Sequence, residues 1–90
     1  MKTKMYNFYM DPGHGWAKVK VSELIALGIS NAISAYSYRK GDYAYLEEDC
    51  DLARFYEAQK ARGINVRFNV HSSSRSSRIR NYDRYVKFFS

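Results

Sequence analysis

A short loop near the N-terminus, Asp11-Pro-Gly-His-Gly-Trp16, brings together a carboxylate, an imidazole and an indole. A histidine can serve as a general base or a metal ligand, so His14 could act beside Asp11 in a small hydrolase or metal-dependent enzyme. No nucleophile or second ligand is spaced near it, and a proline followed by glycines is typical of a turn. We therefore interpret the loop as a hairpin turn anchored by Trp16 and keep the enzyme as an alternative.

The remaining candidate metal ligands, His71 and Cys50, lie far from His14 in the sequence. Neither C-x-x-C nor H-x-x-x-H spacing is present. Cys50 lies between Asp49 and Asp51 at an expected helix start, where the helix dipole lowers a thiol pKa and the carboxylates raise it. The sequence therefore predicts no metal, no cofactor and no catalytic residue, and an inert thiol at Cys50.

The run Glu47-Glu-Asp-Cys-Asp51 contains four carboxylates. Asp49 and Asp51 suit a solvated helix start, which the helix dipole stabilises. Glu47 and Glu48 precede that start, so they remain available to bind a cation or a basic partner, or to mimic the phosphates of a nucleic acid.

The formal net charge of +6 is concentrated towards the C-terminus. Residues 61–90 contain seven lysines and arginines against one acid, which favours an anionic partner. Arginine pairs with phosphate in bidentate geometry and tyrosine stacks on bases, although no known nucleic-acid-binding module is recognisable. The alternative is a solvated loop and scattered ion pairs. The candidate nucleic-acid-binding residues are Arg67, Arg75, Arg78, Arg80, Tyr82 and Arg84.

The segment from Tyr36 to Tyr45 predicts a β-hairpin with Lys40-Gly41 as its turn. In this register Tyr38 faces Tyr43 and Tyr36 faces Tyr45, so all four rings share one face. Small side chains occupy the opposite face, where helices can approach closely, and we expect the tyrosines to be exposed as a contact surface. The candidate partner-binding residues are Tyr36, Tyr38, Tyr43, Tyr45, Glu47 and Glu48.

The elements that position these residues follow from hydrophobic periodicity. The pattern predicts one α+β domain, a mostly antiparallel sheet of about five strands with two helices packed on one face, in the order ββαββαβ. Residues 72–77 are expected to form a mobile loop, and residues 78–90 fit either a helix or a strand. The expected strands are 5–10, 16–21, 33–39, 43–47 and 64–71, and the expected helices are 23–27, begun by Ser22, and 51–62, capped by Asp49 or Asp51.

Five motifs carry a family resemblance over roughly residues 8–85: Gly13-His-Gly-Trp16, Ser22-Glu-Leu, Tyr36-Ser-Tyr, Gly41-Asp42 and Tyr45-Leu-Glu-Glu-Asp-Cys-Asp51. On these motifs the chain resembles a group of small uncharacterised accessory proteins of tailed bacteriophages and related mobile elements. The resemblance implies a protein made in the cytoplasm of an infected bacterium. Proteins of that kind are often non-enzymatic binders that block or redirect a host factor, including a component of host defence.

Three functions follow as expectations. The first is a non-enzymatic, phage-type binder that occludes a host protein or protein–nucleic-acid complex through the tyrosine face together with the basic C-terminal segment. The alternative is direct binding of nucleic acid by the arginine-rich C-terminal third, and the third is an enzyme at the loop of Asp11 and His14. A homodimer formed through an exposed edge strand is also expected as an option, and no membrane segment is present.

Overall fold

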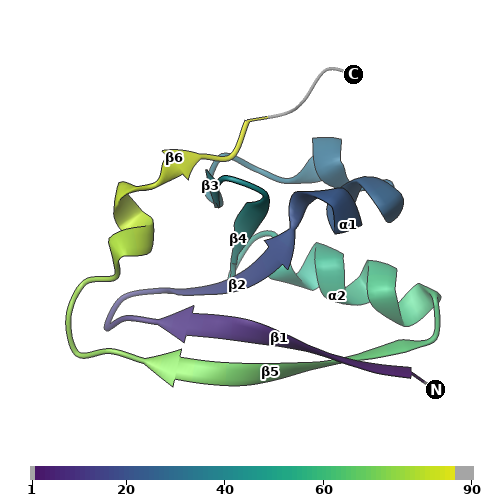
Figure 1. Ribbon diagram of the computed structural model, residues 1–90, viewed down its shortest axis with the longest axis horizontal. Helices are drawn as coiled ribbons and strands as arrows, with labels where there is room; N and C mark the ends of the chain where they lie inside the picture. The colour runs from purple at the N-terminus through teal and green to yellow at the C-terminus, as the bar shows by residue number, and fades with distance from the viewer. Residues whose placement is uncertain (1, 87–90) are drawn as a thin grey trace.

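A six-stranded mixed sheet forms the frame of the protein, in the strand order β5-β1-β2-β4-β3-β6. The computed structural model describes residues 2–86. Figure 1 shows the sheet with two α-helices and two short 3₁₀ helices, η1 and η2. In chain order the elements are β1 (Lys2–Met10), β2 (Gly15–Lys20), α1 (Val21–Ala26), η1 (Ser30–Ala32), β3 (Tyr38–Lys40), β4 (Tyr43–Glu47), α2 (Leu52–Ala61), β5 (Ile64–Ser72), η2 (Arg78–Asn81) and β6 (Asp83–Arg84).

The predicted α+β class is confirmed, and the sheet is mostly antiparallel as expected, but it has six strands rather than about five and includes one parallel pair. β1 and β5 run parallel over their full length, from Lys2 beside Ile64 to Met10 beside Ser72, as Figure 1 also shows. All other strand pairs are antiparallel. The parallel pair arises because α2 carries the chain from β4, in the middle of the sheet, across to the far edge. A sixth strand, β6, closes the opposite edge.

Both α-helices pack on one face of the sheet. The alternating apolar residues of the strands meet α1 and α2 there, and the Tyr6 ring lies edge-on to Phe55 of α2, with centroids 5.1 Å apart. This pattern is the one expected from the period of two in each strand. The buried core on this face consists of Val19, Val21, Leu24, Ile33, Ala44, Leu46, Phe55, Val66 and Tyr85.

A buried polar contact joins the two helices to β1. The Gln59 side chain of α2 donates to the Tyr6 hydroxyl at 2.7 Å and to the Glu23 carboxylate of α1 at 2.8 Å, while Tyr6 donates to Glu23 at 2.6 Å. Burial, followed by the contact with Glu23, raises the pKa of the Tyr6 hydroxyl. All three side chains therefore have partners, which makes their burial tolerable.

The helix ends follow the sequence pattern better than the helix starts. After α1, Ile29 N donates to Leu24 O at 3.0 Å, which forms a Schellman contact around Gly28. At the start of α1 the structure differs, because the helix begins at Val21 and Ser22 caps nothing. Asp51 precedes α2 without capping it: its carboxylate instead accepts hydrogen bonds from Ser34 and Ser37 and fixes the chain before β3.

The tyrosine hairpin has a different register from the predicted one. Tyr38 pairs with Tyr45 and Lys40 with Tyr43, so the turn is Gly41-Asp42 rather than Lys40-Gly41. The reason is Gly41, whose φ of 60° suits the first central position of a tight hairpin turn. The predicted strand also begins too early: Tyr36 lies in a turn before β3 and does not face Tyr45.

The segment after β5 crosses the face of the sheet that the helices leave open. It contains the short 3₁₀ helix η2 and then the two-residue strand β6, which pairs with β3, in place of the longer helix or strand that was expected. Ile79 of η2 is buried against this face. Residues 87–90 of the predicted terminal element lie outside the described residues, and the mobility expected for 72–77 stays a prediction.

Candidate nucleic-acid interface

The face of the sheet opposite the helices carries a second aromatic cluster. Trp16, Tyr45 and Ile79 form its buried centre. Partly buried rings surround this centre, contributed by β1, β3, β4 and the C-terminal segment: Tyr9, Tyr38, Tyr43 and Tyr82. Because the strands alternate, the same face also carries the basic side chains of β2. We call this surface the open face.

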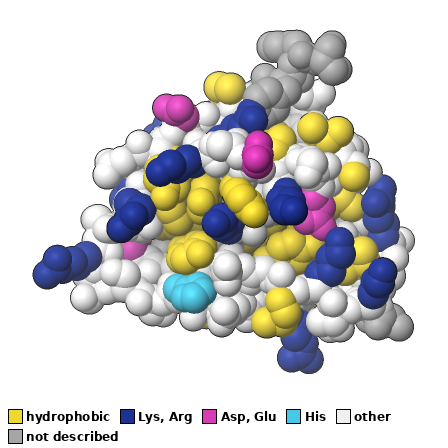
Figure 2. Space-filling model, viewed as in Figure 1, with side chains coloured by type: hydrophobic (Ala, Val, Ile, Leu, Met, Phe, Trp, Pro, Cys, Tyr) yellow, Lys and Arg dark blue, Asp and Glu magenta, His cyan; other side chains and the backbone are white. Residues whose placement is uncertain are grey.

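Basic side chains lie over the rings of the open face. The Lys18 ammonium is 4.3 Å from the centroid of Tyr43, and that of Lys40 is 4.8 Å from the centroid of Tyr82. The Arg84 guanidinium lies 5.4 Å from the Tyr38 ring. Each distance is within the range of a cation–π contact, which holds the cation near the surface without neutralising its charge. Figure 2 shows hydrophobic side chains in the middle of one face, with lysines and arginines among and around them and fewer acidic side chains.

The open face has little acid to balance these cations. The strands contain two carboxylates within the described residues, Glu47 and Asp83. Register places Asp83 beside Arg39, off the open face, and Glu47 is buried at one end of it. Arg67, Arg75 and Arg78 have no ion pair with any residue between 2 and 86. The surface is therefore a net positive, aromatic one.

Asp11 fastens the C-terminal segment to this face. Its fully buried carboxylate receives two hydrogen bonds from the Arg80 guanidinium, at 2.6 and 2.8 Å, and one from Ser77 N at 2.9 Å. The backbone N–H groups of Gly13 and His14 also donate to it, each at 3.0 Å. The contact with Arg80, assisted by these backbone donors, holds the pKa of Asp11 far below its usual value. Asp11 is thus an ionised structural anchor, with no free lone pair for acid–base chemistry.

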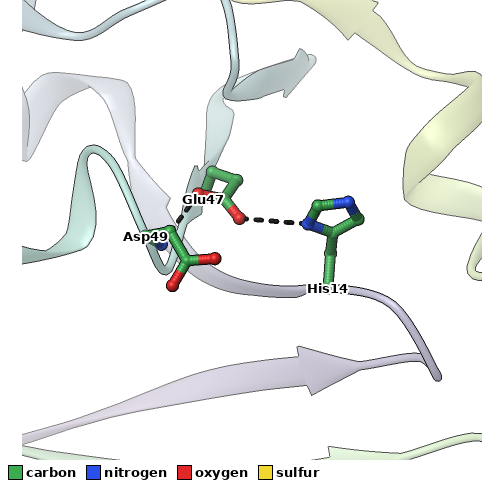
Figure 3. Close-up of side chains that lie close together, drawn as sticks. All are labelled: His14, Glu47 and Asp49. Carbon is green, nitrogen blue, oxygen red and sulfur yellow. Dashed lines mark hydrogen bonds and ion pairs between the residues drawn. The ribbon is translucent and has the colours of Figure 1, made fainter.

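His14 lies on the other side of the same turn and meets two carboxylates, as Figure 3 shows. His14 Nδ1 is 3.3 Å from Glu47 Oε1, and the second oxygen of Glu47 accepts a hydrogen bond from Asp49 N at 2.7 Å. One ligand atom from each of His14, Glu47 and Asp49 lies within 4.8 Å of the others. These three groups could hold a divalent cation, with solvent completing the shell. The guanidinium groups of Arg80 and Arg84 line the same pocket of about 440 Å³ and oppose a cation there.

The Cys50 thiol and the Trp16 indole also line this pocket. Cys50 is exposed, and partial desolvation together with a hydrogen bond to Glu47 raises the pKa of its thiol. A raised pKa leaves little thiolate at neutral pH, and the inert role expected for Cys50 stays a prediction. Trp16 is 1% exposed, and its Nε1 is the one buried side-chain donor between residues 2 and 86 without an acceptor.

The structure separates the predicted partner-binding residues into two groups. Tyr38, Tyr43 and Tyr45 share the open face, although Tyr45 is buried under Ile79 and Tyr82 rather than exposed as predicted. The small side chain of Ala44 faces the helices, which confirms the prediction for the opposite side of the hairpin.

Tyr36, Glu47 and Glu48 are not part of the exposed surface formed by these tyrosines. Tyr36 is 66% exposed and lines the His14 pocket with Glu47. Glu47 is not available as a surface acid, because it is buried against His14 and Asp49. Glu48 is exposed, and its backbone N–H donates to Gly15 O, which joins β4 to the start of β2.

The predicted nucleic-acid-binding residues come together more closely. Arg78 and Tyr82 contribute to the open face with Arg75 from the preceding loop, and Arg67 alternates onto the same side of β5. Two members are constrained by other contacts. Arg80 is committed to Asp11, and Arg84 Nη1 donates to Ala35 O at 2.9 Å while its guanidinium lies over Tyr38.

Sequence reasoning missed three residues of the interface, namely Tyr9, Lys18 and Lys40. The signal for Lys18 was present, since it alternates with the apolar residues of β2. Tyr9 and His71 lie on neighbouring parallel strands, a pairing between the two ends of the chain that no local pattern reveals.

No family model, curated protein or solved structure matches this chain. None of the helices within residues 2–86 is long and apolar enough to cross a membrane.

Proposed function

We propose that this protein is a non-enzymatic binder of single-stranded nucleic acid and that the open face is its contact surface. The observation that supports this function best is the combination of tyrosine rings and unneutralised cations on one face of the sheet. Single-stranded nucleic acids are bound by surfaces of this composition, because cations follow the phosphates while rings stack on the bases.

The shape of the face favours a single strand over a duplex. The surface is a sheet partly covered by an irregular segment, and both α-helices within residues 2–86 are packed on the opposite face rather than free to enter a major groove. Exposed bases can instead lie across a sheet and stack on its aromatic residues. The rings with partial exposure are Tyr9, Tyr38, Tyr43 and Tyr82.

The bacteriophage origin and the bacterial cytoplasm implied by the resemblance are part of the same proposal. In that setting the protein would cover a single-stranded region of host or phage nucleic acid and keep another factor from it. A basic, aromatic face suits this role better than it suits a protein partner, unless that partner presents an acidic surface of matching size.

The expected salt dependence follows from the charges. If four cations such as Lys18, Lys40, Arg75 and Arg78 contact phosphates, log K should fall with log salt with a slope of about −2.8. Affinity would then drop about 50-fold between 50 and 200 mM salt. Loss of two of these cations should reduce the slope to about −1.4.

A titration of a fluorescein-labelled single-stranded oligonucleotide, followed by anisotropy, tests this function. The variant Lys18→Gln/Lys40→Gln should bind more weakly and with the shallower slope. Its matched control is Arg54→Gln/Lys60→Gln, which removes the same charge from exposed positions of α2 on the other layer. Equal weakening by both pairs would show a general charge effect and would refute the open face as the contact surface.

A further inference from the structure

We propose that a pocket at one end of the open face binds one nucleotide unit, with its phosphate on Arg75 and Arg78 and its base on the ring stack of Tyr9 and His71. The pocket lies between the ends of β1 and β5 and the loop of residues 72–77, which we call the serine loop. This inference rests on the proposed function and names the ligand unit that the surface recognises.

The composition of the pocket is that of an anion site. Its volume is about 500 Å³, which is within the usual range for small-molecule sites. Lys18, Arg75, Arg78 and His71 line it with four serines, and none of the lining residues is an aspartate or a glutamate. An anionic ligand would therefore meet donors and positive charge on several sides without repulsion.

The arginines of the pocket are free to pair with a phosphate. The guanidinium groups of Arg75 and Arg78 have no hydrogen bond or ion pair within residues 2–86. The Ser73 hydroxyl oxygen accepts a hydrogen bond from Arg75 N at 3.1 Å, which leaves its proton to donate elsewhere. Two guanidinium forks and a hydroxyl make a suitable set of donors for a phosphate monoester.

Tyr9 and His71 line the same pocket as the arginines and offer aromatic rings for the base of the nucleotide. The rings of Tyr9 and His71 are stacked, with centroids 5.0 Å apart and planes 17° apart. The His71 Nε2 lies 3.2 Å from the Asn7 side-chain oxygen, which fixes the plane of the imidazole. Tyr45 and Tyr82 also line the pocket, with ring centroids 5.1 Å apart and planes tilted by 56°. Stacking on aromatic rings would accept a base of any sequence.

The walls are held in position by the fold itself. At one end of the serine loop, Ser73 N donates to Met10 O at 2.9 Å. At the other end, Ser77 N donates to the buried carboxylate of Asp11. Both anchors lie on the segment that leaves β1, so the pocket is formed before any ligand binds, which lowers the ordering cost of binding.

Isothermal titration of the full chain with AMP, adenosine and inorganic phosphate tests the pocket directly. AMP should bind more tightly than either of the other two, because only AMP uses both the arginines and the rings. The variant Arg75→Gln/Arg78→Gln should lose at least tenfold in AMP affinity. Tyr9→Leu should lose a similar factor in AMP affinity while keeping the weak affinity for inorganic phosphate. His71→Gln makes the same test at an exposed ring, where the substitution disturbs packing less than at the partly buried Tyr9.

The control Arg54→Gln/Lys60→Gln should bind AMP as the unmodified protein does. If AMP and inorganic phosphate bind equally, or if the arginine variant binds AMP normally, the pocket assignment is wrong. An oligonucleotide that still binds would then leave the proposed function standing. Binding of AMP without any binding of the oligonucleotide would support the pocket and refute the wider function.

Discussion

The contacts of Asp11 predict how much free energy of unfolding is lost when this carboxylate is replaced. Replacing Asp11 with asparagine keeps the size of the side chain but leaves one acceptor oxygen for five N–H donors and adds an amide N–H₂ group facing them. The Arg80 charge loses its partner at the same time. Removing one member of a buried ion pair costs about 3–5 kcal/mol. Arg80 is 35% exposed, so water screens part of its charge and we expect a loss of about 3 kcal/mol.

A loss of that size is easy to detect. A domain of this length is stable by about 5–13 kcal/mol, so the variant would lose a quarter to more than half of its stability. The assay is urea unfolding at pH 7 followed by the fluorescence of Trp16, which is the one tryptophan of the chain and is buried. Asp42→Asn is the matched control. That side chain is exposed in the hairpin turn, and its loss should change the free energy of unfolding by less than about 0.5 kcal/mol.

The pH dependence of this effect has a definite sign. The pKa of Asp11 is lowered in the folded protein, so its contribution to stability is complete above the unfolded pKa of about 4 and declines as the pH falls below it. The difference between the unmodified protein and Asp11→Asn should therefore shrink steadily from pH 4 towards pH 2. An unfolding midpoint at pH 7 that is the same in both proteins would refute the role of Asp11 as an anchor.

Two further predictions concern packing and the thiol. In Gly15→Ala the new Cβ would overlap the buried ring of Phe8, so we expect a loss of about 1–3 kcal/mol in the free energy of unfolding, measured by urea titration; an unchanged value would mean that the ring moves freely. Cys50 should react with iodoacetamide at pH 8 more slowly than free cysteine, because its pKa is raised, and Glu47→Gln should speed the reaction by removing a carboxylate that contributes to the shift. The extent of alkylation is measured by mass spectrometry. Equal alkylation rates in the unmodified protein and in Glu47→Gln would contradict the influence of Glu47 on the thiol.

Local patterns predicted much of the fold because each element carries its own period. The alternation along β5 predicted that strand, and the small side chains opposite the tyrosines, such as Ala44, correctly indicated the face that the helices cover. The register of the hairpin was wrong by two residues. A shift of two keeps every side chain on its own face, so Tyr38 and Tyr43 still share a surface although they are not directly paired.

The site depends on contacts between distant parts of the chain, which explains why less of it was predicted. Tyr9 and His71 meet because β1 pairs with β5, and Asp11 meets Arg80 across almost the whole sequence. Neither contact leaves a local signal. The sequence indicated the chemistry of the C-terminal arginines, but only the fold shows that Arg80 has a structural role and that Arg75 and Arg78 remain available.

The central claim is that the open face binds single-stranded nucleic acid. The most direct measurement is the anisotropy of a labelled single-stranded oligonucleotide, titrated with the unmodified protein at 50 and at 200 mM salt. We expect binding at the lower salt and an affinity about 50-fold weaker at the higher one. Absence of binding at 50 mM salt, or an affinity that does not change with salt, would contradict the account.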